Sequence, residues 1–412
     1  MVRSSRSRPL RDGKEAACQA AVARIVVHQA EVGGEVPTSD TGDDCRARAK
    51  LNETALHELS VEIADEVESR ADAKWLWKGR HAKRVDGFTL TMPDTPANQA
   101  EYPPPSSQKA GVGFPIARVC AILSLATAGV MDVALGPYSG KQTGETALLR
   151  QRRDSFDEGD VVVADRYDCS FLMIALLLSR GVQVCARLHQ RRQTDFRRGQ
   201  RLGKYDHLIV WTRPSRPAWM DEATYATIPD TLTLRAIRFQ IVQPGCRTKV
   251  MTIATTLTEA DMSTKADIAE LYGFRWNSEL DIRSIKPSLN LNHVRCKSPE
   301  MVRRELWTTL RGYNLIRTTT AAAALLHEKP PRQISFTAAC QYVLAAWSRF
   351  SSSDIPPAEF ETRCRQLLQQ IAECEVANRP GRIEPRELKR RRHGYKLMQQ
   401  PRNILKKQLL AN

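Results

Sequence analysis

The chain has 412 residues, 42% hydrophobic and 26% charged, which is long enough for two or three domains with one sizeable core. Its formal net charge of +16 favours a nucleic-acid partner, DNA or RNA, because Lys and Arg that neutralise phosphates release condensed counterions. The ten cysteines form no CxxC pair, so we expect no zinc fingers. No apolar h-region follows the basic N-terminus, and the longest uncharged apolar stretch, 119–131, is too short to span a bilayer. We therefore expect a cytoplasmic protein without a membrane partner.

The first 80 residues predict a small helical region. Apolar residues recur at helical spacing in 14–32 and again in 51–70. The stretch between them, GGEVPTSDTGDD, is rich in Gly, Pro and Asp and predicts a loop. Residues 1–80 therefore form the first unit of the predicted organisation.

Strands and helices alternate across residues 81–190. HAKRVDGFTLTM predicts a strand that turns near Gly87, and GVGFPIARVCAILSLATAGVMDVAL predicts two strands that meet at 127–129. Residues 142–152 predict a helix, and DVVVAD is a short apolar strand that ends in Asp165, as expected of a buried central strand. A helix ending at a glycine and the strand VQVCARL follow. This alternation predicts an α/β fold with a mixed sheet and flanking helices.

The second half of the chain changes character twice. Residues 191–257 contain HLIVW, LTLRAIRFQIV and TKVMTIATTL, three strand-like runs that predict a β-rich insertion. Helical patterns resume in 258–330 and continue in 331–412. The stretch 379–407 holds eleven Lys and Arg against two Glu and predicts a basic arm at the surface.

Two aspartates stand in strands where a carboxylate is unfavourable. Asp165 ends an apolar strand, and Asp86 lies in the sequence VDG between apolar residues. An ionised carboxylate resists desolvation unless it is paired or binds a metal ion. For either residue alone, an aspartate that only caps the next turn is the more common explanation, so neither is specific by itself.

A third carboxylate lies in a predicted helix over 265–286. In YGFRWNSELDIRSIK, spacings of three and four residues place five side chains on one stripe of this helix: Tyr272, Arg275, Glu279, Arg283 and Lys286. A solvated face with Glu–Arg pairs, each worth about 0.2–0.5 kcal/mol, is the ordinary explanation. The neighbouring Trp276 and the apolar Leu280 and Ile285 favour instead a helix buried on its other faces, which could hold a metal ion and a DNA strand together.

The spacing Tyr272-x2-Arg275-x3-Glu279-x6-Lys286 resembles the YREK signature of the insertion-sequence 4 family of bacterial transposases. Other stretches are similar to that family, over nearly the whole chain: WKGRHAKRVDG with TMPDTPANQAEYP, GFPIARVCAILSLATAG, VVVADRYDCSF, GKYDHLIVW, RGYNLIR and KRRRHGYKL.

This resemblance implies a ribonuclease-H-like catalytic core that is interrupted by the β-rich insertion. Residues 81–190 and 258–330 would form the two parts of the core, between a helical DNA-binding region at 1–80 and a helical and basic region at 331–412. The catalytic and metal-binding triad would be Asp86, Asp165 and Glu279. Three hard carboxylate ligands suit two Mg²⁺ ions, with Mn²⁺ as a substitute, and two such ions promote phosphoryl transfer.

The family's signature side chains contact DNA near the cleaved end, which implies this role for Tyr272, Arg275 and Lys286. Arg283 lies on the same stripe, and Trp276 would stack on or near a displaced base. The implied function is cleavage and strand transfer on double-stranded DNA, at terminal inverted repeats and in target DNA, by a homodimer associated with the bacterial nucleoid.

Other polar residues near these motifs have secondary interpretations. Glu145 and Asp168 would be further carboxylates near the site, and Arg166 and Tyr167 would line the DNA path. The isolated histidines predict structural roles or nucleic-acid contacts: His81, His189 and His207.

The sequence departs from the family pattern at three places. Phe88 stands where the family has a small hydroxyl residue, Asp168 stands where it has an aromatic residue, and the N-terminal helical region is shorter. Two alternatives to an active transposase therefore stay open. One is a catalytically decayed or truncated DNA-binding protein derived from a transposase, and the other is a nuclease that uses the same triad without strand joining.

Overall fold

The structure of the chain is a computed structural model. It describes residues 18–105, 109, 111–189, 191–192, 194–241, 250–289, 291, 294–351, 355–376 and 399–411. For 18–21, 276–279, 287–288, 348–349 and 351 it describes the backbone only. Most of the predicted basic arm, 379–398, lies outside these ranges.

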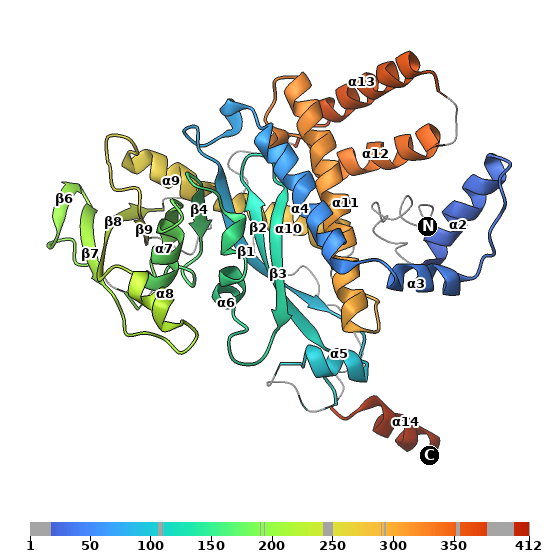
Figure 1. Cartoon of the computed structure of the whole chain (residues 1–412), viewed down its shortest axis with the longest axis horizontal. Coiled ribbons are helices and arrows are strands. Elements are labelled where there is room, and N and C mark those ends of the chain that lie inside the picture. The colour runs from blue at the N-terminus through green and yellow to red at the C-terminus, as the bar shows by residue number, and fades with distance from the viewer. Residues whose placement is uncertain are drawn as a thin grey trace.

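Among the residues that the structure describes, nine strands form one mixed sheet in the order β3-β2-β1-β4-β5-β9-β8-β7-β6 (Figure 1). Its first half comprises β1 (Ala82–Thr91), β2 (Ile116–Ser124), β3 (Val130–Pro137), β4 (Val161–Ala164) and β5 (Gln183–Arg187). The strands β1, β2 and β3 are antiparallel neighbours, whereas β4 runs parallel to β1 and β5 runs parallel to β4. This order and these directions are those of a ribonuclease-H-like core, so the predicted fold is confirmed.

The predicted β-rich insertion is also present. It contains β6 (Gln200–Gly203), β7 (Asp206–Thr212), β8 (Thr231–Gln240) and β9 (Val250–Thr255), which are antiparallel neighbours. Because β9 pairs antiparallel with β5, the insertion extends the core sheet at its β5 edge instead of forming a sheet of its own. The short strand β6 was not predicted.

Helices cover both faces of the core strands. On one face, α11 (Pro299–Leu326) packs beside α4 (Glu53–Ser69), and a hydrophobic cluster joins α11 to β1, β2 and β3 (Figure 1). On the other face lie α6 (Glu145–Arg150) and α7 (Phe171–Leu178). The sequence of α7, FLMIALLL, is apolar throughout, as expected of a helix that is buried on all sides. Side chains that alternate along β1 therefore enter two different cores.

Two of the remaining helices begin at capping signals within stretches that contain loop-forming residues. Asp40 caps α3, so this helix begins inside the predicted Gly/Pro/Asp-rich loop, and Thr95 and Pro96 start α5 inside TMPDTPANQAEYP. The remaining helices are α2 (Cys18–Glu31), α3 (Thr41–Ala49), α5 (Pro96–Glu101), α8 (Glu222–Thr227), α9 (Lys265–Gly273), α10 (Asn277–Arg283), α12 (Phe336–Ser351), α13 (Pro357–Glu373) and α14 (Arg402–Ala411). None of the helices in the described ranges is long and apolar enough to cross a membrane.

A buried glutamate ties α4 to the turn between β2 and β3. The Thr127 hydroxyl donates a 2.9 Å hydrogen bond to one oxygen of Glu68, and His81 Nδ1 lies 2.9 Å from the other. Burial opposes ionisation of Glu68, but hydrogen bonds from His81, Ser124 and Thr127 prevail and lower its pKa. The same bond raises the pKa of His81 against the effect of burial. His81 therefore has a structural role in this fold.

This pair predicts a pH-dependent stability. The stabilisation of the fold by ionised Glu68 is fully present above the pKa of 4.5 that this group has in the unfolded chain. It is lost as pH falls through the lower pKa that Glu68 has in the folded protein. The stabilisation of the fold by protonated His81 is fully present below the pKa of 6.5 that this group has in the unfolded chain. It is lost as pH rises through the higher pKa that His81 has in the folded protein. We therefore expect His81→Gln to lower the melting temperature more at pH 5.5 than at pH 8.5, by about 2–4 °C for a partly exposed pair worth about 1 kcal/mol. Thermal unfolding at both pH values measures this, with His28→Gln on α2 as the control. An equal loss at the two pH values would contradict the pairing.

Candidate catalytic site

The first two predicted catalytic residues follow the paired part of two parallel strands whose register is defined. The parallel strands β1 and β4 pair Arg84 with Val163, and two residues further along each chain are Asp86 and Asp165. Neighbouring strands lie about 4.8 Å apart, and residues at matching positions face the same side. The charges of Asp86 and Asp165 also add to the rise in the pKa of Glu145, after the larger effect of burial.

The prediction that the strand turns near Gly87 is wrong, because β1 continues through this residue to Thr91. Asp86 is therefore a residue of the strand interior, with its side chain on the opposite face from Gly87. A Cβ atom at Gly87 would overlap the side chain of Glu145, so glycine at this position lets α6 approach the strand.

Asp86 is held by a buried arginine on its own strand. The guanidinium of Arg84 donates a 2.8 Å hydrogen bond to Oδ2 of Asp86, and the N–H of Gly87 donates a 3.0 Å bond to Oδ1. Arg84 is 1% exposed, and its other terminal nitrogen donates to the carbonyl of Arg275. Arg84 was not among the predicted site residues, although a cation two residues before a strand aspartate shares its face of the sheet.

Asp165 has one paired and one unpaired oxygen. Its Oδ2 lies 3.4 Å from the guanidinium of Arg275. Its Oδ1 is buried and has no hydrogen-bond partner among the described residues. Because a buried carboxylate oxygen without a partner is unfavourable by about 1–3 kcal/mol or more, this atom has the environment that a bound cation would complete.

Two further carboxylates, both predicted from the sequence, lie at α6, and the charges of Asp86 and Asp165 affect the titration of both. Glu145 lies in the first turn of α6, and Asp168 is buried and accepts a 2.9 Å hydrogen bond from Thr146. Burial raises the pKa of Asp168 to about 7 in spite of that bond, and the charges of Glu145, Asp165 and Asp86 add to the rise. Burial, with Asp86 and Asp165, also raises the pKa of Glu145. Burial and the neighbouring carboxylates therefore both oppose ionisation of Asp168.

The signature segment is not the single helix that its periodicity predicts. Helix α9 ends at Gly273, a 3₁₀ turn spans Phe274–Trp276, α10 spans Asn277–Arg283, and a π-helical turn spans Ser284–Ser288. The proline at position 287 explains the π turn. A proline has no N–H to donate within an α-helix, and an α-helical backbone would bring its ring against the carbonyl four residues earlier.

These breaks distribute the predicted stripe over several environments. Tyr272 is 4% exposed in a hydrophobic cluster, and its hydroxyl has no hydrogen-bond partner among the described residues. Arg275 faces Asp165, Arg283 is exposed, and the half-buried Lys286 has its Nζ 5.7 Å from the centre of the Phe88 ring. The prediction that these side chains share one face of a helix is therefore wrong.

The position of Glu279 follows from the backbone alone. Glu279 is four residues, about one helical turn, beyond Arg275, which contacts both Arg84 and Asp165. The segment that carries Glu279 is thus adjacent to both strand aspartates. Within the side chains that the structure describes, which do not include Glu279 and Trp276, no group of three or more His, Cys, Asp or Glu is arranged to hold a metal ion.

The residues after Asp165 differ in exposure. Tyr167 is 66% exposed and packs edge-on against His189, with ring centres 5.9 Å apart. His207 is buried, and its Nδ1 lies 3.1 Å from the carbonyl of Arg198, which is a structural contact within the insertion. Tyr167 and His189 therefore present an aromatic surface beside the carboxylates.

Residues 79–315, more than half of the chain, match the model of the transposase DDE domain. The chain belongs to the transposase DDE domain family. It is 24% identical over 355 residues to transposase InsG for insertion sequence element IS4 of Escherichia coli (strain K12), across 85% of this chain and 76% of the relative. The predicted insertion-sequence 4 family is thereby confirmed, and this transposase is an enzyme of the DDE type.

A solved structure of the piggyBac transposase, in a synaptic complex with hairpin DNA, is similar to the transposase with a TM-score of 0.39 and 7% identity. The similarity covers 73% of this chain and 58% of that chain. Transposases of the DDE family act on DNA and use divalent metal ions, which agrees with the acidic site described above.

We expect a divalent cation to stabilise the transposase through Asp165. An ion that binds only the folded state, at a concentration about a hundred times its dissociation constant, adds about 2.7 kcal/mol to the free energy of unfolding. Each kcal/mol raises the melting temperature by roughly 2–4 °C. Asp165→Asn removes the charge that attracts the ion and should cancel most of this rise. Thermal unfolding with EDTA and with excess Mg²⁺ measures it, and Asp261→Asn, at an exposed aspartate, is the control. A full Mg²⁺ effect in the Asp165 variant would place the ion elsewhere.

Proposed function

We propose that this transposase binds the terminal inverted repeats of its element and catalyses metal-dependent cleavage and strand transfer with Asp86, Asp165 and Glu279. One observation carries the proposal. Oδ1 of Asp165 is buried without a hydrogen-bond partner in the described part of the chain, at the end of the strand that pairs in parallel with the strand of Asp86. Arg275, which contacts Asp165, lies four residues before Glu279 and supports the inclusion of that glutamate.

Asp86, Asp165 and Glu279 would hold two Mg²⁺ ions, for which Mn²⁺ would substitute. When bound, such ions supply Lewis-acid activation of the attacking oxygen and charge stabilisation at the leaving oxygen. The guanidinium of Arg84 donates to one oxygen of Asp86 and the N–H of Gly87 donates to the other, so these two bonds would hold the carboxylate in place for the ions.

The cations of the signature segment would hold the DNA backbone. Arg275 pairs with Asp165 at 3.4 Å, a long contact that a phosphate would replace once a metal ion neutralises the carboxylate. Burial lowers the pKa of Lys286, whose ammonium faces the Phe88 ring, and a phosphate is a better partner for that charge. Arg283, Tyr272 and Trp276 complete the proposed contacts, although Tyr272 would have to leave its buried position to reach DNA directly.

The net charge of +16 supports a large DNA interface, and terminal repeats and target DNA are the proposed partners. A homodimer would bring two active sites to a pair of element ends, and binding to the chromosome would place the protein at the nucleoid.

Replacing Glu279 by Gln is expected to lower the cleavage rate by about 10³-fold or more, the loss of roughly 4 kcal/mol of transition-state stabilisation. Binding of an end-containing duplex should stay nearly unchanged, because the substitution removes no cation. Single-turnover cleavage and fluorescence anisotropy measure the two quantities. Glu270→Gln, at an exposed residue of α9, is the matched control. Cleavage by the Glu279 variant at the wild-type rate would exclude this triad.

Neutralising the basic cluster Lys389, Arg390, Arg391 and Arg392, which lies outside the described residues, is expected to weaken binding to all DNA sequences. The slope of log K against log salt should flatten by about 1 for each phosphate contact that is lost. Titrations at several salt concentrations measure this slope. Arg363 and Arg365, which form ion pairs with Glu359 and Glu361 on α13, provide a control pair for replacement by Gln. An unchanged slope would show that the arm does not contact DNA.

A further inference from the structure

We propose that the buried carboxylate of Asp281, held by Arg317 and Arg332, positions the backbone that carries Glu279. Asp281 follows Glu279 by two residues in α10, so the two share one turn of the same short helix. Asp281 would act through that backbone as a positioning residue and would not touch the reacting atoms. This inference rests on the catalytic role proposed for Glu279.

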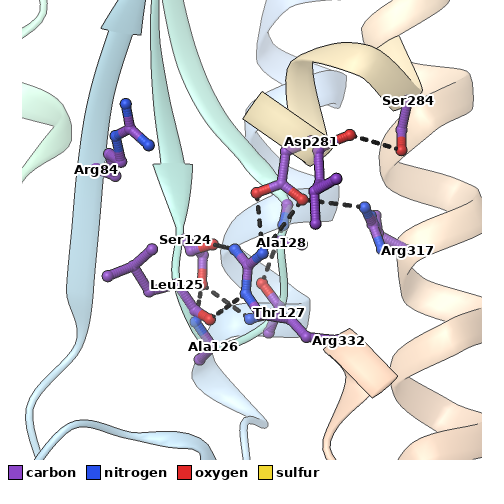
Figure 2. Close-up of polar contacts among 12 residues, drawn as sticks. Arg84, Ser124, Leu125, Ala126, Thr127, Ala128, Asp281, Ser284, Arg317 and Arg332 are labelled. Atoms are coloured by element: carbon purple, nitrogen blue, oxygen red, sulfur yellow. Dashed lines mark hydrogen bonds and ion pairs between the residues drawn. The ribbon is translucent and has the colours of Figure 1, made fainter. Parts of the chain in front are cut away.

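Figure 2 shows Asp281 pointing from α10 toward two arginines that come from other elements. Asp281 is 3% exposed. Its Oδ1 lies 3.3 Å from Nη2 of Arg317, on α11, and 3.2 Å from Nη1 of Arg332, in the 3₁₀ turn Pro331–Gln333. The same Arg332 nitrogen lies 3.0 Å from Oδ2. Both oxygens of the carboxylate are thus held by cations.

Each of these arginines is fixed in turn by the core sheet. Arg332 donates to the carbonyls of Ser124, at 2.6 Å, and of Leu125, at the end of β2 (Figure 2). Arg317 donates a 2.9 Å hydrogen bond to the hydroxyl of Tyr313, which donates at 2.8 Å to the carbonyl of Ala128. The Asp281 carboxylate is therefore connected to the turn between β2 and β3 by two separate routes.

The segment around Glu279 needs such contacts because its own helical structure is weak. A seven-residue helix between a 3₁₀ turn and a π turn has few internal hydrogen bonds and would not be stable in isolation. Before Glu279, Arg84 holds the carbonyl of Arg275, and after it the two arginines hold Asp281. Glu279 therefore lies between two points at which the backbone is fixed to the sheet.

Stability alone does not explain a buried charge at this position. Burying an ion pair often gives no more stability than apolar side chains of similar volume, whereas its geometry is more specific. The neighbouring Ile285 already packs α10 and the following turn into the hydrophobic core. The directional bonds of Asp281 add an orientation for α10, and an error of about 1 Å at a reacting group can lower a rate by about 10²-fold.

The test uses the full chain, an end-containing duplex and Mg²⁺. Asp281→Asn keeps the shape of the side chain but removes its charge. We expect a 10–100-fold lower single-turnover cleavage rate, a higher Mg²⁺ concentration for half-maximal rate, and a DNA dissociation constant within about twofold of the wild type. The matched control is Asp206→Asn, because Asp206 is a buried aspartate that pairs with Arg235 in the insertion.

The control separates positioning from stability. Asp206→Asn should lower the melting temperature to a similar degree without moving the Mg²⁺ requirement. If the two variants lose equal stability and have the same Mg²⁺ requirement, the positioning role of Asp281 is wrong. If Asp281→Asn does not fold, Arg332→Lys is the alternative variant, because it keeps the positive charge but loses the planar guanidinium that binds both carboxylate oxygens. A wild-type Mg²⁺ requirement in the Arg332→Lys variant would also overturn the proposal. Cleavage by the Glu279→Gln variant at the wild-type rate would instead reject the proposed function itself.

Discussion

The parallel pairing of β1 with β4 is the constraint on which the rest of this site depends. It aligns the two strands as far as Arg84 and Val163, two residues before Asp86 and Asp165. Neighbouring carboxylates repel each other unless cations neutralise them. Arg84 contacts the first carboxylate and Arg275 contacts the second. Because Arg84 also binds the carbonyl of Arg275, the groups that neutralise the strand aspartates bring the signature segment to them.

The turn between β2 and β3 connects these parts of the molecule. Ala128 adopts a left-handed backbone with φ of +61°, which is unfavourable for a residue with a side chain by about 1–2 kcal/mol. Tyr313 binds its carbonyl, Glu68 binds the adjacent Thr127, and Arg332 binds the end of β2. One short turn thus joins α4, α11 and the Asp281 carboxylate, so displacement of any of these elements would be transmitted to α10.

Local patterns in the sequence predict local structure here, and pairings between distant residues account for what they miss. The apolar run before Asp165 is sufficient to predict a central strand, and the glycine near 129 is sufficient to separate β2 from β3. The alignment of Asp86 with Asp165 depends on register, which no local pattern contains. Asp281 stands between two apolar residues in LDI, a signal for a buried acid, but its partner Arg332 is 51 residues away. The helical period over 265–286 failed because Pro287 and the contacts at Arg275 and Asp281 replace a continuous α-helix with two short α-helices, a 3₁₀ turn and a π turn.

Charge acts in opposite directions on two length scales in this transposase. The net charge of +16 attracts DNA to the molecule as a whole. At the site, burial raises the pKa values of Glu145 and Asp168, and the charges of Asp86 and Asp165 add to the rise. Ionised carboxylates at this site would repel a phosphate in the absence of a cation. Long-range attraction therefore brings DNA to the surface, whereas entry of a phosphodiester into the site depends on metal ions. A protein that cuts DNA benefits from this separation, because tight binding to any DNA does not by itself place a phosphate against the catalytic carboxylates.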